Sequence, residues 1–394
     1  MSSFSQKDFV IDNKLGLKVL AGMNMVIHCH HYNARLQRTL EQNHKINGKE
    51  IFRNAATITY WELLKELDAV KRPSDKAQFI ENLYKFLGFG TLNLSSLEED
   101  RATSSSGHFV EGWNCGALKT KGTVCTMTEG FLEGAIKAMY NLDVEVRETC
   151  CANQPGVERC EFQITRNKSG LNFHLAKKNK VSSPARDNST EVLSNIKAET
   201  IIDAVMNMPL SGNNEGLIPA FNVYLAHTPQ DFYNRVALNF IAEMNKVGFG
   251  SIAKEMLVED AEHCALNTFG GVLESEEWSA LVLPMVKEEK DNLFGLVAVA
   301  NALGWGRCHI TEHTPYKTLT LHSSNGYEAY GHIETKGYSD TPQCFMLRGV
   351  CAGLMGLVYE NGELEDRSGK FLSRESSCLA ARAHQCEFKV ERDE

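Results

Sequence analysis

A cluster of three cysteines and one glutamate occurs twice along the chain, and this repeat constrains the fold more than any other feature. Each copy contains a single Cys, then Glu-x-x-Cys, then Cys-Glu-Phe. The members are Cys125, Glu148, Cys151 and Cys160 in the first copy, and Cys344, Glu375, Cys378 and Cys386 in the second. Comparison of the copies selects Cys151 over the adjacent Cys150, because only Cys151 keeps the Glu-x-x-Cys spacing. We call these two four-residue sets the first and second clamp.

Further matches in the same order extend the repeat beyond the clamps. Segment 85–94 matches segment 301–310, and each contains a Gly-aromatic-Gly turn. A weaker match aligns Asn24 with Asn222 near the start of each copy. A chain of 394 residues is long enough for two domains. We therefore expect a first repeat at 1–168 with its core at 79–166, a linker at 169–189, and a second repeat at 190–394 with its core at 293–392.

The hydrophobic pattern predicts the α/β (α+β) class, built as two tandem repeats. Apolar strands are expected at 23–28 and 221–226, each followed by long helical segments such as 230–245. Each copy ends in two short alternating segments, for example 144–148 and 161–164 in the first. We therefore expect each repeat to be an antiparallel sheet packed with helices, with its clamp on the closing hairpin.

The composition of each clamp suits a zinc ion. Three thiolates and one carboxylate complete a tetrahedral shell, and soft sulfur favours zinc over magnesium or calcium. Such a closed shell leaves no position for a catalytic water, so the predicted role is structural, with one zinc per repeat. The alternative is that these are buried thiols without a metal, because free cysteine is among the most buried residues.

The pattern resembles the 4-vinyl-reductase domain family, over roughly 79–164 and 293–390. That family occurs in bacteriochlorophyll biosynthesis and as the sensing module of aromatic-catabolism regulators. The resemblance implies an antiparallel sheet packed by helices, a zinc ligated by the clamp residues, and a pocket for a small apolar or aromatic molecule. This chain departs from the family in being a tandem, in its longer second hairpin, and in having no AAA+ or helix-turn-helix output segment after the repeats.

Charge and hydropathy narrow the classes of partner and location. Fifty acidic against forty-one basic residues give a net charge of -9, which argues against a dedicated nucleic-acid-binding protein. No apolar run is long enough to span a membrane, and the chain opens without a signal-like segment. We therefore expect a cytoplasmic protein, where twelve cysteines indicate metal ligands or buried thiols rather than disulfides.

Histidines suggest a second metal or cofactor site. In a strand, His28 and His30 would share one face, with His31 on the other, and same-face imidazoles form half of a site for a redox metal or haem. Glu259 and His263 share a face of a predicted helix. The alternatives are a polar strand end for the histidines and an exposed helix face for the second pair.

Aromatic residues near the Gly turns and before the clamps are candidates for a ligand pocket, although core packing explains them equally well. They are His108, Trp113, Trp305, Tyr327 and Tyr330, and we place His108, Trp113, Tyr327 and Tyr330 in strand regions.

The sequence thus predicts a zinc-containing small-molecule-binding protein, acting as sensor, carrier or accessory factor for an apolar, aromatic or tetrapyrrole-like ligand. A homo-oligomer or a pathway enzyme is the expected protein partner. The alternative is a metal-dependent oxidoreductase or lyase that uses a site around His28 and His30.

Overall fold

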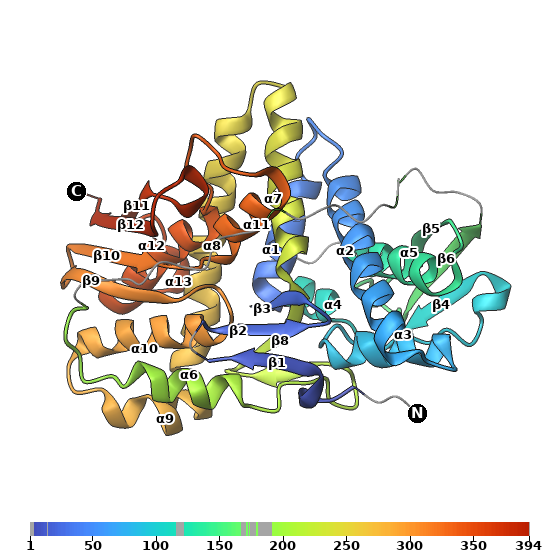
Figure 1. The fold of residues 1–394 in the computed structure, drawn as a ribbon, viewed down its shortest axis with the longest axis horizontal. Coiled ribbons are helices and arrows are strands. Elements are labelled where there is room, and N and C mark those ends of the chain that lie inside the picture. The colour runs from blue at the N-terminus through green and yellow to red at the C-terminus, as the bar shows by residue number, and fades with distance from the viewer. Residues whose placement is uncertain are drawn as a thin grey trace.

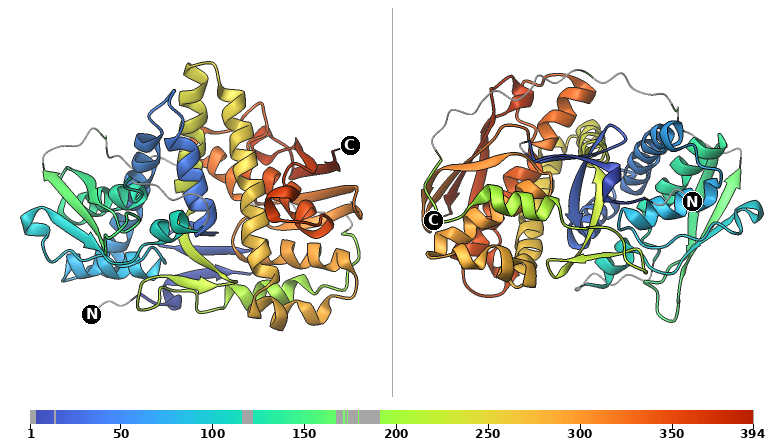
Figure 2. Two further views of the ribbon diagram at one scale, coloured as in Figure 1. Left: turned by 180° about the vertical axis from the view of Figure 1, so that it is seen from behind. Right: turned by 60° about the horizontal axis from the view of Figure 1, so that its bottom comes forward.

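The computed structural model describes residues 4–13, 15–115, 122–166, 171, 173, 179 and 191–393. It combines helices with three antiparallel sheets of five, four and three strands, which confirms the expected fold class. The three-stranded and four-stranded sheets lie at opposite ends of the longest axis, with the long helices and the five-stranded sheet between them (Figures 1 and 2). Of the expected linker 169–189, only Leu171, Phe173 and Asn179 lie within the described residues.

The first half supplies the following elements: β1 (Phe9–Asp12), β2 (Leu17–Leu20), β3 (Met23–Cys29), α1 (His30–Glu41), α2 (Gly48–Lys71), α3 (Lys76–Phe86), β4 (Arg101–Ser104), α4 (His108–Asn114), α5 (Thr126–Tyr140), β5 (Val144–Cys150) and β6 (Cys160–Arg166). The second half supplies these: α6 (Ala198–Met206), β7 (Ile218–Ala220), β8 (Val223–Pro229), α7 (Gln230–Lys246), α8 (Gly250–Leu273), α9 (Glu276–Leu281), α10 (Glu289–Ala302), β9 (Cys308–Thr314), β10 (Thr318–Ser323), α11 (Tyr327–Lys336), α12 (Phe345–Tyr359), α13 (Leu364–Arg367), β11 (Phe371–Ser377) and β12 (Cys386–Arg392). None of the described helices has the length and apolar character needed to cross a membrane.

The closing hairpins of the two halves have the same register. In β5–β6, Glu148 lies opposite Phe162 and a bulge separates it from Cys150. In β11–β12, Glu375 lies opposite Phe388 and a bulge separates it from Ser377. A bulge adds one residue to one strand and bends that strand locally. Each clamp therefore gets its Glu-x-x-Cys segment from a strand that bends at the same point.

Paired glycines allow the long helices to pack closely in each half. A Cβ at Gly130 of α5 would lie 2.3 Å from the Arg53 oxygen of α2, and one at Gly353 of α12 would lie 2.6 Å from the Glu262 oxygen of α8. In each half, the helix that follows the N-terminal cysteine of the clamp is therefore packed against the longest helix of that half.

The five-stranded sheet joins the halves, because β3 of the first pairs with β8 of the second in the order β1-β2-β3-β8-β7. Each of these strands also bonds the Gly turn of the opposite half. Ile27 N donates to Leu303 O at 2.9 Å, and His227 N donates to Leu87 O at 2.8 Å. Gly304 has a φ of +86°, and a Cβ there would meet the Met25 oxygen at 2.9 Å. The opening strands are therefore exchanged between the halves.

The positions of the helices that follow β3 and β8 correct the alignment at the start of the repeat. Helix α1 begins at His30 and α7 at Gln230, so Asn24 corresponds to Tyr224 and not to Asn222. Apolar residues alternate in both strands, so the sequence matches itself nearly as well two residues out of register. The left-handed turns before β3 and β8 decide the register in the fold; their positive-φ residues are Ala21, Gly22, Phe221 and Asn222.

Candidate metal centres and buried histidines

The first clamp brings its three thiols to tetrahedral spacing. Cys125 immediately precedes α5, Cys151 comes directly after β5, and Cys160 opens β6. The Sγ–Sγ distances are 3.6 Å for Cys125–Cys160 and 3.9 Å for Cys151–Cys160. A disulfide would require about 2.05 Å. Zinc–sulfur bonds of about 2.3 Å in a tetrahedron put the sulfurs about 3.8 Å apart, which matches the distances found.

The second clamp has the same geometry. Cys344 lies 3.6 Å from Cys386 and 3.9 Å from Cys378, and Cys378 lies 3.9 Å from Cys386, all between sulfurs. In each clamp the three sulfurs and one carboxylate oxygen lie within 4.8 Å of one another. Both four-residue sets inferred from the repeat therefore converge in space and can hold a metal ion.

The two glutamates are held in the same way. Glu148 Oε2 accepts a bond of 2.8 Å from Cys125 N, and Glu375 Oε2 accepts one of 2.9 Å from Cys344 N. Among the described residues, the Oε1 atom of each finds no hydrogen-bond partner although it is buried. One oxygen thus fixes the carboxyl group, and the other is left as the fourth ligand atom.

The electrostatics of the clamps favour a bound cation. Burial, together with the charge of the nearby Cys151, raises the pKa of Glu148 to about 8. Burial and Cys378 raise the pKa of Glu375 to about 9. Acidic groups gathered away from water stay protonated unless a positive charge compensates them. A bound metal ion would supply that charge. In the first clamp the backbone N–H of Ala152 also donates to the Cys160 sulfur at 3.3 Å.

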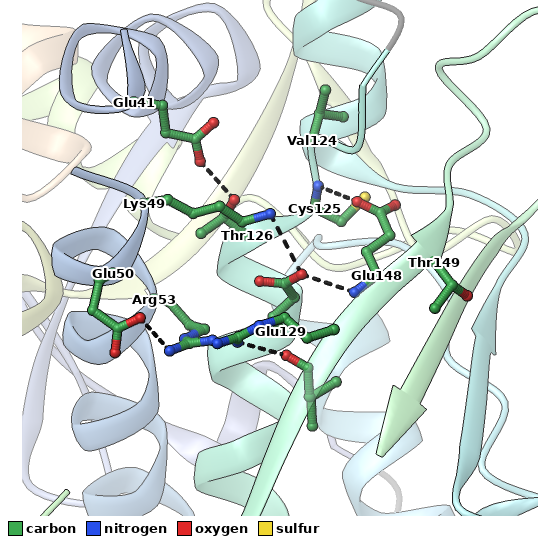
Figure 3. A network of polar contacts seen from close by, with 12 residues as sticks. Glu41, Lys49, Glu50, Arg53, Val124, Cys125, Thr126, Glu129, Glu148 and Thr149 are labelled. Carbon is green, nitrogen blue, oxygen red and sulfur yellow. Dashed lines mark hydrogen bonds and ion pairs between the residues drawn. The ribbon is translucent and has the colours of Figure 1, made fainter. Parts of the chain in front are cut away.

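The two clamps differ in what surrounds them. Glu129 lies between the backbone of Glu148, from which it accepts a bond of 2.8 Å, and the Lys49 ammonium at 3.6 Å (Figure 3). In the second half the matching helix position carries Arg348, which pairs with Glu255 at 2.7 Å. The ligands are therefore repeated, whereas the charges around them are not.

His28 lies at the centre of the molecule among aromatic rings. It is 0% exposed, and its ring centroid lies 4.6 Å from Tyr32, 4.5 Å from Tyr233 and 5.0 Å from Trp305. Neither ring nitrogen finds a hydrogen-bond partner among the described residues. Burial lowers the pKa of His28 to about 3, so the ring is neutral at pH 7. The site is an aromatic cage around one unsatisfied imidazole.

The five candidate pocket residues do not gather at one site. Trp305 and Tyr327 join His28, and Tyr32, Tyr233 and Tyr327 also line an adjacent cavity of about 20 Å³. His108 lies instead in the first half, where its Nε2 is 2.9 Å from Nδ2 of Asn33. The Oδ1 atom of Asn33 accepts a hydrogen bond of 2.8 Å from the hydroxyl of Tyr233, a residue of the second half.

The expected strand regions before the clamps are helices. His108 and Trp113 lie on α4, and Tyr327 and Tyr330 lie on α11. Gly107 and Gly326 precede these helices as N-caps, which ends the strand pattern there. Trp113 is buried, and Tyr330 is half-buried near the second clamp, where burial raises its pKa to about 12.

His30 and His31 do not share the surroundings of His28. Cys29 caps the N-terminus of α1, so the strand ends and the expected same-face alternation of His28 and His30 is lost. His30 Nδ1 accepts from Tyr224 N at 3.2 Å, and its Nε2 lies 3.3 Å from the Cys115 sulfur. Sequence reasoning missed Cys115 and Tyr224, because no local spacing connects them to the histidines.

Glu259 and His263 lie together on α8, with 3.9 Å between Oε1 and Nε2. Glu259 is exposed and also pairs with Arg35 at 3.5 Å. Within the described part of the chain, the groups of three or more converging metal-ligand residues are the two clamps. The structure thus does not join this pair to His28, His30 and His31.

Comparison with known proteins gives a remote similarity. No family profile and no curated protein matches the chain. Among solved structures, the crystal structure of the phenol-responsive sensory domain of the transcription activator PoxR with phenol is similar to part of it. The identity is 11%, the match covers 50% of this chain and 90% of that chain, and the TM-score is 0.40.

Proposed function

We propose that this chain is a zinc-containing protein that binds a small aromatic molecule, as a sensor, carrier or accessory factor. The observation that carries the proposal is the convergence of three thiols and one carboxylate at tetrahedral spacing, found twice. Protein atoms fill all four positions, so each zinc would stabilise its hairpin through metal-coupled folding rather than activate water. The resemblance of the clamp pattern to the 4-vinyl-reductase domain family agrees with this role.

The aromatic cage supports the choice of ligand. Its walls are the rings of Tyr32, Tyr233 and Trp305, and the imidazole of His28 at its centre has no hydrogen-bond partner among the described residues. Such a setting suits a flat apolar molecule with a single hydrogen-bonding group. The adjacent cavity of about 20 Å³ is the size of one water, so a ring would enter only by displacing aromatic side chains. A phenol-sized molecule therefore fits the proposal better than a tetrapyrrole.

Metal analysis tests the zinc part of the proposal. The purified protein is expected to contain about two zinc ions per chain, and Cys151→Ser and Cys378→Ser are each expected to remove about one. Cys150→Ser is the matched control, because Cys150 adjoins the first clamp without joining it. A metal-free protein whose stability is unchanged by both clamp substitutions would refute the zinc assignment.

Thermal shift measurements with phenol test the ligand part. Phenol at millimolar concentration is expected to raise the melting temperature of the wild type, and His28→Phe is expected to abolish that shift. His44→Gln, which alters an exposed histidine, serves as the control. An equal phenol shift in the wild type and in His28→Phe would place the ligand elsewhere.

The oxidoreductase or lyase alternative gains no support from the geometry. It needs His28 and His30 in one site, whereas His28 is enclosed by aromatic rings and His30 is bound to Tyr224 and Cys115. A cytoplasmic location and a partnership with a second copy or a pathway enzyme stay predictions.

A further inference from the structure

A second cavity, separate from the clamps and the aromatic cage, opens between the two halves. It has a volume of about 480 Å³. Its lining residues are His30, His31, Cys115, Pro219, Ala220, Phe221, Asn222, Val223, Tyr224, Glu276 and Glu277. One half thus supplies a thiol and two imidazoles, and the other supplies two carboxylates. These are the side chains that bind transition-metal ions.

The hydrogen bonds of His30 determine how this cavity can act. Because the Tyr224 N–H donates to Nδ1, that nitrogen carries no proton, and in the neutral ring the proton resides on Nε2. Nε2 faces the Cys115 sulfur at 3.3 Å, so His30 donates to the sulfur. His30 therefore cannot take the proton of the thiol as a general base, which excludes a Cys–His nucleophile of the protease type. An N–H donor to sulfur is instead the arrangement found around metal-bound thiolates.

The remaining contacts favour a cation. The His31 ring lies 4.0 Å from that of His30, between centroids, and neither His31 nor Cys115 is fully buried. Glu276 and Glu277 line the cavity, and the described lining includes no Lys or Arg. The charges of Glu111 and Glu215 add to burial in raising the pKa of Tyr224, so they extend the negative field to this cavity.

We propose that this cavity is an exchangeable site for a thiophilic transition-metal ion, held by the Cys115 thiolate and the His31 imidazole. The metal–sulfur bond forms as the thiol proton leaves to solvent, and His30 supports the sulfur through its Nε2–H. Water completes the shell, and Glu276 and Glu277 contribute negative charge to the same cavity. With only two firm protein ligands, the ion would exchange readily, unlike an ion enclosed by a clamp.

Cobalt titration of the full zinc-loaded protein tests the site. Co²⁺ bound to a thiolate absorbs in the near ultraviolet, and zinc released to the filtrate reports any exchange at the clamps. The wild type and Cys150→Ser are expected to gain about one Co²⁺ per chain without releasing zinc. Cys115→Ser is expected to lose the thiolate band, and His31→Gln to bind about tenfold or more weakly.

A second measurement does not depend on the variants folding. Co²⁺ is expected to slow the alkylation of Cys115 by iodoacetamide in the wild type, mapped by mass spectrometry, and to leave that of Cys150 unchanged. Equal cobalt spectra in the wild type and Cys115→Ser, cobalt uptake matched by zinc release, or no protection of Cys115 would each overturn the proposal. If the zinc assignment of the clamps were wrong, the protein would contain little zinc before the titration, so that result is distinguishable from a failure of the cobalt site.

Discussion

Replacing His28 by Phe is expected to stabilise the fold, although the residue lies at its centre. Both ring nitrogens are buried without a partner among the described residues, and each such group costs about 1–3 kcal/mol. The planes of the His28 and Trp305 rings are inclined by 20°, and a phenyl ring at position 28 can keep this stacking. Its larger size adds a packing cost of about 1–3 kcal/mol. The expected net gain at pH 7 is about 1–2 kcal/mol of unfolding free energy.

The gain in unfolding free energy from His28→Phe should grow as the pH falls. Burial lowers the pKa of His28 from 6.5 to about 3, so between these values the unfolded chain binds a proton that the folded chain does not. Stability from this group is therefore present above pH 6.5 and is lost progressively below it. At 1.36 kcal/mol per pKa unit, the wild type loses about 2 kcal/mol through His28 between pH 7 and pH 5. His28→Phe avoids that loss.

Urea denaturation at fixed zinc concentration, at pH 7 and pH 5, measures both effects. Acid release of zinc affects the wild type and the variant alike, so it cancels in their difference. His44→Gln is the control, and its stability should stay within about 0.5 kcal/mol of the wild type. The reasoning is refuted if His28→Phe destabilises the protein at pH 7, or if its advantage is the same at both pH values.

Further predictions concern the clamps and the exchanged strands. Chelation of zinc is expected to lower the melting temperature measured by calorimetry. Cys378→Ser is also expected to lower the melting temperature, and metal analysis should show the loss of one zinc. Glu375→Gln keeps an oxygen for the Cys344 N–H but loses the charge, so a competition titration should show zinc affinity about 10–100-fold weaker at the second clamp. Gly304→Ala is expected to cost about 2–4 kcal/mol, from its left-handed φ and its approach to the Met25 oxygen. Gly369→Ala, where φ is +72° and a Cβ would meet nothing within 4 Å, should cost only about 1–2 kcal/mol in the same denaturation assay.

The clamps are the part of the site that the sequence alone could identify. Their members come from one hairpin and the helix before it, with Cys125 and Cys160 only 35 residues apart. Because β-strand register and bulge position are set locally, a repeated spacing is enough to show which cysteines converge. The choice of Cys151 over Cys150 rests on the same spacing. The sequence also predicted where most helices and strands lie, because the hydrophobic period of each element depends on neighbouring residues.

Only the tertiary structure decided what surrounds the histidines. The Trp305 ring that stacks on His28 donates to Ile27 O across 278 residues, and His30 meets Cys115 across 85. The Trp305 contact arises because the opening strands are exchanged between the halves, and both the exchanged and the unexchanged arrangement satisfy the same hydrophobic pattern. The pattern determines which residues are buried. Which distant residues they meet depends on the packing of the whole chain.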